Sequence, residues 1–158
     1  FSRSNSKGGY RWDYDVPYLG FKYHGNSIMA SMALIQLKYL DEDNNRRNEI
    51  CSKYDSLLSG IDSINSIVTS DYTFKSSRHL YQIYSLEHSR EVILENFYKK
   101  NIFPGVHYKD NRQYLMYKSN SSLPNVDKYS DKIISLPLHL EMSDDDISKV
   151  ADKLLEMH

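Results

Sequence analysis

The chain has 158 residues, of which 40% are hydrophobic, and this size and composition predict one globular domain or one and a part. Its formal net charge of −1 gives no reason to expect nucleic acid or an anionic membrane as a partner. The single cysteine, Cys51, excludes an internal disulfide framework and favours a reducing, cytoplasmic compartment.

The first 18 residues predict irregular chain with a cluster of aromatic side chains, namely Tyr10, Trp12, Tyr14 and Tyr18. The chain begins at Phe1 with neither an initiator methionine nor a signal peptide, so we expect a portion of a longer protein. The stretch from Ser4 to Gly9 contains a Ser-x-x-Lys pattern, but no apolar neighbours that would lower the lysine pKa. We therefore assign no nucleophile here.

Residues 19–40 read LGFKYHGNSIMASMALIQLKYL, in which Gly20 and Gly25 bracket four residues. This spacing is that of a nucleoside-triphosphate loop, which requires a lysine directly after the second glycine. Asn26 occupies that position instead, so the chemistry of such a loop is not met. The segment predicts a helix with Asn26 or Ser27 as its N-cap, because either side chain can accept a hydrogen bond from a first-turn N–H.

The helix predicted from Ile28 to Leu40 has almost no polar stripe. A helix that is apolar all round is buried, either inside a large core or in a subunit interface. Its apolar run is too short to span a bilayer, which takes about 20 residues. At its amino end, the helix dipole and free N–H groups favour an anion. The polar cluster there consists of Lys22, Tyr23, His24 and Asn26.

The following chain predicts alternating helices and strands, beginning with a helix from about Asp43 to Leu58 that ends before Gly60. The later elements are a short strand at 64–68, a strand at 78–86, a helix at 88–101, a strand or turn at 102–108, helical turns at 111–118, a loop and helix at 121–133 and a strand at 133–140. The inward face of the helix at 43–58 is expected to contain Ile50, Tyr54, Leu57 and Leu58. That of the helix at 88–101 is expected to contain Val92, Ile93, Phe97 and Tyr98. This order predicts a compact α/β layer.

The last segment, residues 143–158, predicts a helix with Ser143 as its N-cap. Three consecutive acidic residues, 144–146, fill its first turn. They lack the alternating spacing of a calcium loop, so we interpret them as partners of the helix dipole. Its apolar stripe is expected to consist of Ile147, Val150, Leu154 and Leu155.

His107 and Tyr108, in FPGVHYKDNR, follow a Pro-Gly turn at a predicted strand end, where side chains are often presented to a cleft. Histidine is the usual proton-transfer residue near neutral pH, and Arg112 lies close enough in sequence to add an anion-binding group. A polar surface loop is the alternative interpretation of the same residues.

His79 and His139 each stand among apolar neighbours, which is typical of core or edge histidines with satisfied hydrogen bonds. No two histidines have metal-binding spacing and no cysteine joins them, so we expect no structural zinc site. Cys51 lies in a charged helical stretch and is interpreted as an ordinary helix residue.

Four segments, in this order, resemble the DegT-type sugar aminotransferases, the pyridoxal-phosphate (PLP) enzymes that aminate nucleotide-linked keto-sugars. They are YDVPYLGFKYHGNSIMASMALIQLKYLDEDNNRR, SSRHLYQI, NIFPGVHYKDNRQYLMY and IISLPLHLEMSDDDISKV, and they extend from about Tyr14 to Val150. The resemblance implies an α/β fold, the C-terminal small domain of a fold type I PLP-dependent transferase, with a small sheet packed against helices. Residues 1–45 would end the large PLP-binding domain and include a buried interface helix, and residues 46–158 would form the small domain.

The resemblance also implies a homodimer and the roles of several residues. In the family, the loop before the buried helix reaches across the dimer to the cofactor phosphate of the neighbouring subunit, and Lys22 is the matching position. Many members carry an acidic residue where Ser27 stands and Arg or Asn at His24, so no role is carried over to these two. The His107–Tyr108 pair, together with Arg112, would contact the nucleotide-linked sugar.

The family's Schiff-base lysine, its pyridine-nitrogen acid and its ring-stacking residue all belong to the N-terminal large domain. The resemblance therefore implies that this chain alone neither holds PLP covalently nor catalyses transamination, for which glutamate is the family's usual amino donor. Two other hypotheses remain open. One is a non-catalytic dimerisation or regulatory module, and the other is a free-standing nucleotide-sugar-binding protein that uses His107, Tyr108 and Arg112.

Overall fold

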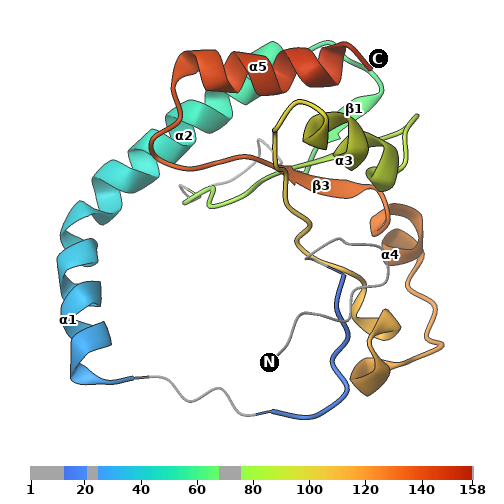
Figure 1. Ribbon diagram of the computed structural model, residues 1–158, viewed down its shortest axis with the longest axis horizontal. Helices are drawn as coiled ribbons and strands as arrows, with labels where there is room; N and C mark the ends of the chain where they lie inside the picture. Colours follow the sequence, from blue (N-terminus) through green and yellow to red (C-terminus); the bar gives the residue numbers. More distant parts are fainter. Residues whose placement is uncertain (1–12, 21–24, 68–75, 158) are drawn as a thin grey trace.

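The computed structural model describes residues 13–20, 25–67 and 76–157 (Figure 1). The predictions made for residues 4–12, Lys22 and His24 lie outside the described residues. The described elements, in chain order, are α1 (Ser27–Gln36), the 3₁₀ turn η1 (Leu37–Tyr39), α2 (Leu40–Leu57), β1 (Ile64–Ser66), β2 (Tyr81–Ser85), α3 (Arg90–Tyr98), the 3₁₀ turns η2 (Asn111–Gln113) and η3 (Leu115–Tyr117), α4 (Pro124–Tyr129), β3 (Ile133–Leu136) and α5 (Asp144–Leu155). This order confirms the α/β layer expected from the sequence.

The three strands form an antiparallel sheet with β2 between β1 and β3. Ile83 of β2 pairs with Ile134 of β3, and both side chains belong to the hydrophobic core. Gln82 pairs with Ser135, and these two side chains point to the opposite face because successive strand residues alternate. The register of β2 and β3 therefore separates a core face from a second face that carries Gln82 and Ser135.

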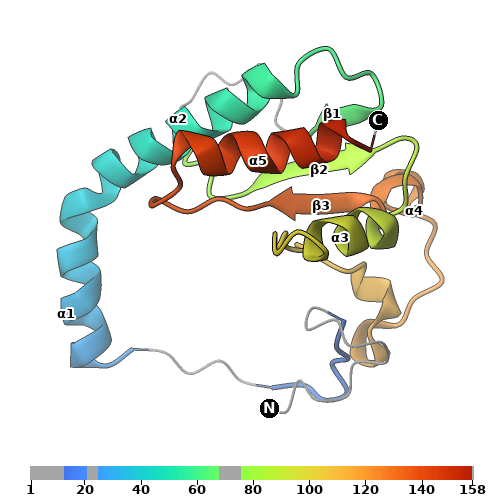
Figure 2. The same cartoon turned by 45° about the horizontal axis from the view of Figure 1, so that its top comes forward.

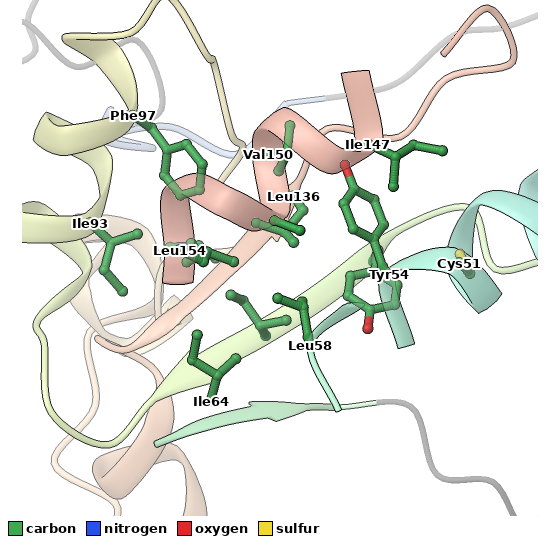
Figure 3. Packing of buried hydrophobic residues seen from close by; sticks show 14 of the residues in the cluster. Cys51, Tyr54, Leu58, Ile64, Ile93, Phe97, Leu136, Ile147, Val150 and Leu154 are labelled. Atoms are coloured by element: carbon green, nitrogen blue, oxygen red, sulfur yellow. The ribbon is translucent and has the colours of Figure 1, made fainter. Parts of the chain in front are cut away.

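Helices α2, α3 and α5 cover the core face of the sheet (Figure 2). Each contributes a large, completely buried side chain, respectively Tyr54, Phe97 and Leu154 (Figure 3). The buried phenol of Tyr54 donates a 2.9 Å hydrogen bond to the carbonyl oxygen of Pro137, just beyond β3. The hydrophobic core therefore packs all three helices against β2 and β3, the two strands whose register was described above.

The buried stripes of the helices are narrower than the sequence analysis expected. Val92 and Leu155, predicted to face inwards, are exposed, and so is Leu57. In α3 the buried positions are 90, 93, 94 and 97, and in α5 they are 147, 150, 151 and 154. Both sets follow the i, i+3, i+4, i+7 spacing of one helix face, which excludes Val92 and Leu155.

The amino end of α5 has the predicted cap. Ser143 Oγ accepts from the backbone N–H of Asp146 at 3.2 Å, and the Asp146 carboxylate accepts from the Ser143 N–H at 3.0 Å. Asp144 pairs with Lys53 and so joins α5 to α2. Cys51 is buried on α2, and the described part of the chain contains no cluster of side chains suited to a metal ion.

Helix α1 lies apart from the core (Figure 1) and is N-capped by Asn26, whose Oδ1 accepts from the N–H of Met29 at 2.9 Å. None of its side chains is buried, and its large apolar residues are 48% to 72% exposed. Burial of this helix in the core formed by the described residues is therefore excluded, whereas its burial in an interface stays a prediction. None of the described helices is both long and apolar enough to cross a membrane.

Arg90, the first residue of α3, is only 4% exposed. Its Nε donates to the carbonyl oxygen of Ile133 at 3.0 Å, and its Nη2 donates to the carbonyl oxygen of Ser130. Burial lowers the pKa of this guanidinium below its ordinary value. The side chain thus joins the start of α3 to the end of α4 and the start of β3.

We expect Arg90→Met to lower the free energy of unfolding by about 1–3 kcal/mol, because it leaves the carbonyls of Ser130 and Ile133 without their charged donor. Urea denaturation measures this change. Arg47→Met is the matched control, since Arg47 contacts Asn44 within its own helix, and its effect should stay below about 0.5 kcal/mol. Equal losses in the two variants would contradict the structural role of Arg90.

Candidate functional site

The candidate site lies on the second face of the sheet, where the chain after Pro104 meets β3. Gly105 and Ser135 exchange two backbone hydrogen bonds, each of 2.8 Å, and form an isolated antiparallel bridge. This bridge fixes the Pro-Gly turn against the strand. It brings His107, two residues after Gly105, to the face that carries Gln82 and Ser135.

His107 is held at two points by neighbouring strands. Its Nδ1 lies 2.9 Å from the hydroxyl oxygen of Ser135, and its carbonyl oxygen accepts a 2.6 Å hydrogen bond from Nε2 of Gln82. Ser135 is only 2% exposed, and Gln82 is its partner across the β2–β3 pair. The strand register therefore fixes both the ring and the backbone of His107.

Gly105 provides the space that the His107 ring occupies. A Cβ atom at Gly105 would lie 2.5 Å from Cε1 and 3.1 Å from Nδ1 of His107. These separations are shorter than the contact distance of non-bonded heavy atoms. The glycine of the Pro-Gly turn is therefore required by the position of the ring.

Burial lowers the pKa of His107 below its usual value of 6.5, and the nearby positive charge of His79 adds a smaller effect in the same direction. At pH 7 the imidazole is therefore mainly neutral, with one donor and one acceptor nitrogen. Tyr108 is 70% exposed, and its ring meets the His107 ring edge-on at a centroid distance of 5.2 Å. The structure thus brings an anchored histidine and an exposed tyrosine together.

Arg112 lies in a network of its own. Its Nε and Nη2 donate to both carboxylate oxygens of Asp110, its Nη2 also contacts Asp127, and its Nη1 donates to the carbonyl oxygen of Ser121 at 2.6 Å. The guanidinium lowers the pKa of Asp110, chiefly by hydrogen bonding. This network connects η2 to α4, and the contact of Arg112 with a substrate stays a prediction.

Residues 13–19 run alongside η2 and η3 (Figure 1). Lys109 pairs with Asp13 at 2.7 Å, and Asp15 accepts a 2.8 Å hydrogen bond from the backbone N–H of Leu115. The sequence analysis missed these contacts because their partners are 96 and 100 positions apart, and no local pattern marks them.

His79 and His139 were predicted to be core or edge histidines, and both are exposed, so the core alternative is wrong for each. His139 follows β3 after Pro137, where the alternation of the strand has ended. His79 precedes β2, and its positive charge contributes to the lowered pKa of His107. The proposed cofactor contact, Lys22, precedes α1 and lies outside the described residues.

The model of the DegT/DnrJ/EryC1/StrS aminotransferase family matches residues 2–155. The chain belongs to this family. It is 32% identical over 152 residues to the UDP-4-amino-4,6-dideoxy-N-acetyl-beta-L-altrosamine transaminase of Campylobacter jejuni, which covers 92% of this chain and 40% of the relative. It is 28% identical over 150 residues to the dTDP-4-dehydro-2,3,6-trideoxy-D-glucose 4-aminotransferase of Saccharopolyspora spinosa, with coverages of 93% and 39%. The chain thus spans about 40% of the length of these relatives.

Solved sugar aminotransferases share the fold of this family member. The PLP form of Spr1654 from Streptococcus pneumoniae superposes with a TM-score of 0.75 at 30% identity, over 89% of this chain and 38% of that structure. PseC from Helicobacter pylori, an aminotransferase of pseudoaminic acid biosynthesis, gives a TM-score of 0.76 at 26% identity, over 92% and 40%. These matches confirm the predicted α/β fold of a fold type I sugar aminotransferase.

We expect His107 to titrate with a midpoint below 6.5, because burial and the charge of His79 disfavour its protonation. Nuclear magnetic resonance (NMR) of the histidine rings measures this midpoint against pH. His79→Gln should move the midpoint of His107 upwards, since it removes the like charge. A midpoint above 6.5 would contradict the buried, neutral ring.

The same shift has a consequence for stability. The folded chain binds the His107 proton less readily than the unfolded chain, whose pKa is near 6.5. The contribution of His107 to the free energy of unfolding is therefore fully present above pH 6.5. It is lost as the pH falls through the lower pKa of the folded state.

Proposed function

We propose that this chain forms the small domain and interface helix of a PLP-dependent aminotransferase that transfers an amino group to a nucleotide-linked keto-sugar. The observation that supports this most directly is the anchoring of His107 by Ser135 and Gln82 on the second face of the sheet, with the exposed Tyr108 beside it. The family membership supports the reaction type, and the two relatives carry the names of enzymes acting on UDP- and dTDP-linked sugars. Glutamate is the proposed amino donor.

In this proposal, His107 and Tyr108 contact the nucleotide-linked sugar. A neutral imidazole and a phenol both offer a hydrogen-bond donor and acceptor, which suit the hydroxyl and phosphate oxygens of such a ligand. His107 is fixed by Ser135, whereas the exposed ring of Tyr108 is free to pack against the sugar. Arg112 is also proposed to contact the ligand, and this contact would compete with its ion pairs to the carboxylates of Asp110 and Asp127.

When bound, PLP supplies the electron-withdrawing ring that allows an amino group to leave the donor and enter the sugar. We place its covalent lysine in a large domain that precedes this one. The two most enclosed ion-paired lysines of the described chain, Lys109 and Lys153, each pair with a carboxylate, from Asp13 and Glu156. Each of these two side chains therefore already has a carboxylate partner within the chain.

The amino end of α1 fits the proposed phosphate contact. Ser27 and the first turn of α1 are exposed, and the positive end of a helix dipole favours a phosphate group. Lys22, five residues before Ser27, is proposed to contact the cofactor phosphate of the neighbouring subunit. The cofactor itself would therefore lie between two copies of the chain.

The exposed apolar side chains of α1 support this arrangement. Helices of this length are marginal in water without tertiary packing, and a contiguous apolar surface marks an interaction site. We propose that the large domain and the second subunit of a homodimer cover α1. Residues 1–45 would then belong structurally to the large domain, although α2 continues without a break through residue 45.

Two half-reactions test the proposed function in the complete aminotransferase that contains this chain. His107→Asn and Tyr108→Phe should each lower kcat/KM for the nucleotide-linked keto-sugar about three- to tenfold, because each removes one hydrogen-bonding group. Amino transfer from glutamate to PLP should continue at the wild-type rate. Absorbance of the cofactor follows both steps.

His139→Asn is the matched control, because His139 is exposed and lies between β3 and α5, where its carbonyl oxygen accepts from the N–H of Met142. It should leave both half-reactions unchanged. Equal losses in both half-reactions for the His107 and Tyr108 variants would contradict a specific sugar contact, and no activity of the wild-type enzyme with any nucleotide-linked sugar would contradict the function.

A further inference from the structure

Ser135 connects the register of the sheet to the orientation of a single imidazole ring. It is bonded to Gly105 through both of its backbone groups and to His107 through its hydroxyl. Gln82, directly opposite on β2, holds the carbonyl oxygen of the same histidine. Gly105 leaves room for the ring, because a Cβ atom there would lie only 2.5 Å from Cε1 of His107. Ser135 of β3, Gln82 of β2 and Gly105 of the Pro-Gly turn thus together determine where the ring of His107 lies.

The hydrogen-bond partners available to the Ser135 hydroxyl also determine the tautomer of His107. Within the described residues, Nδ1 of His107 is the only partner of the buried Ser135 hydroxyl. If this hydroxyl accepted from an Nδ1–H group, its own proton would have no acceptor, and a buried unpaired donor is costly. If it donates to Nδ1, only lone pairs remain unused. The second arrangement places the ring proton on Nε2, which has no hydrogen-bond partner in the described chain.

We propose that Ser135 and Gln82 are positioning residues that hold His107 in its Nε2–H tautomer, so that Nε2 donates to an oxygen atom of the bound nucleotide-linked sugar. This inference rests on the proposed function for the identity of the ligand. The tautomer and the ring position rest on the contacts alone, so they can be measured separately.

The first measurement uses ¹⁵N NMR of the histidine rings in the full chain, because the ¹⁵N shifts of an imidazole report which nitrogen is protonated. The wild-type ring of His107 should show an unprotonated Nδ1. Ser135→Ala removes only the hydroxyl, so the Nδ1 resonance should move while the backbone bridge to Gly105 stays. Ser135→Thr retains a hydroxyl and should restore the wild-type resonance.

Ser85→Ala is the matched control, since Ser85 is also a buried serine of the sheet but accepts from the N–H groups of Glu87 and His88. It should leave the His107 resonances unchanged. Gly105→Ala provides an independent test if Ser135→Ala does not fold, because a methyl group there displaces the ring and leaves Ser135 intact. Its Nδ1 resonance should move in the same direction.

The second measurement uses the complete aminotransferase and its nucleotide-linked sugar. Ser135→Ala should raise KM for the sugar about three- to tenfold, as expected for one misplaced hydrogen bond, with the glutamate half-reaction unchanged. Ser135→Thr should restore KM to within about twofold of the wild type, because its hydroxyl can again donate to Nδ1.

The two measurements distinguish failure of this inference from failure of the proposed function. An Nδ1 resonance of His107 that is the same in wild type and Ser135→Ala would overturn the inference. A moved resonance with an unchanged KM would also overturn it, since the ring would then not contact the sugar. A wild-type enzyme inactive on nucleotide-linked sugars, with the resonance changes as expected, would instead remove the proposed function and with it the ligand named here.

Discussion

The pairing of β2 with β3 is the interaction on which both the core and the site depend. It places Ile83 beside Ile134 under the helices, and it places Gln82 beside Ser135 on the opposite face. A shift of one residue would exchange the two faces, moving an isoleucine of the pair to the site face and a polar residue into the hydrophobic core. The hydrophobic core therefore stabilises the site indirectly, because it fixes the register that aligns the two groups holding His107.

The sequence predicts the local features of this fold well. The cap of α5, the order of helices and strands and the buried stripe from Ile147 to Leu154 all follow from spacing between near neighbours. His107 and Tyr108 were also found, because a Pro-Gly turn at a strand end is a local signal. Gln82 and Ser135 were not assigned a role. They lie 25 and 28 positions from His107 in the sequence, and only the strand pairing brings them into contact with it.

Helix α1 shows how composition can indicate burial without showing which part of a protein provides it. Its sequence is apolar on all sides, yet the described residues bury none of its side chains, and the described core begins at Ile50 on α2. The family relatives are about two and a half times as long as the matched region. We infer that the surface covering α1 belongs to the large domain and to a second subunit, where the proposed contact of Lys22 with the cofactor phosphate would also be completed.

The proposed assignment of this chain to the small domain is tested most directly by locating the lysine that carries PLP. The complete aminotransferase is loaded with PLP and reduced with borohydride, and the modified lysine is identified by peptide mass spectrometry. We expect stoichiometric modification of one lysine outside these 158 residues and none within them. A single lysine of this chain, modified stoichiometrically, would show that the segment holds the cofactor itself and would contradict its assignment as the small domain of the enzyme.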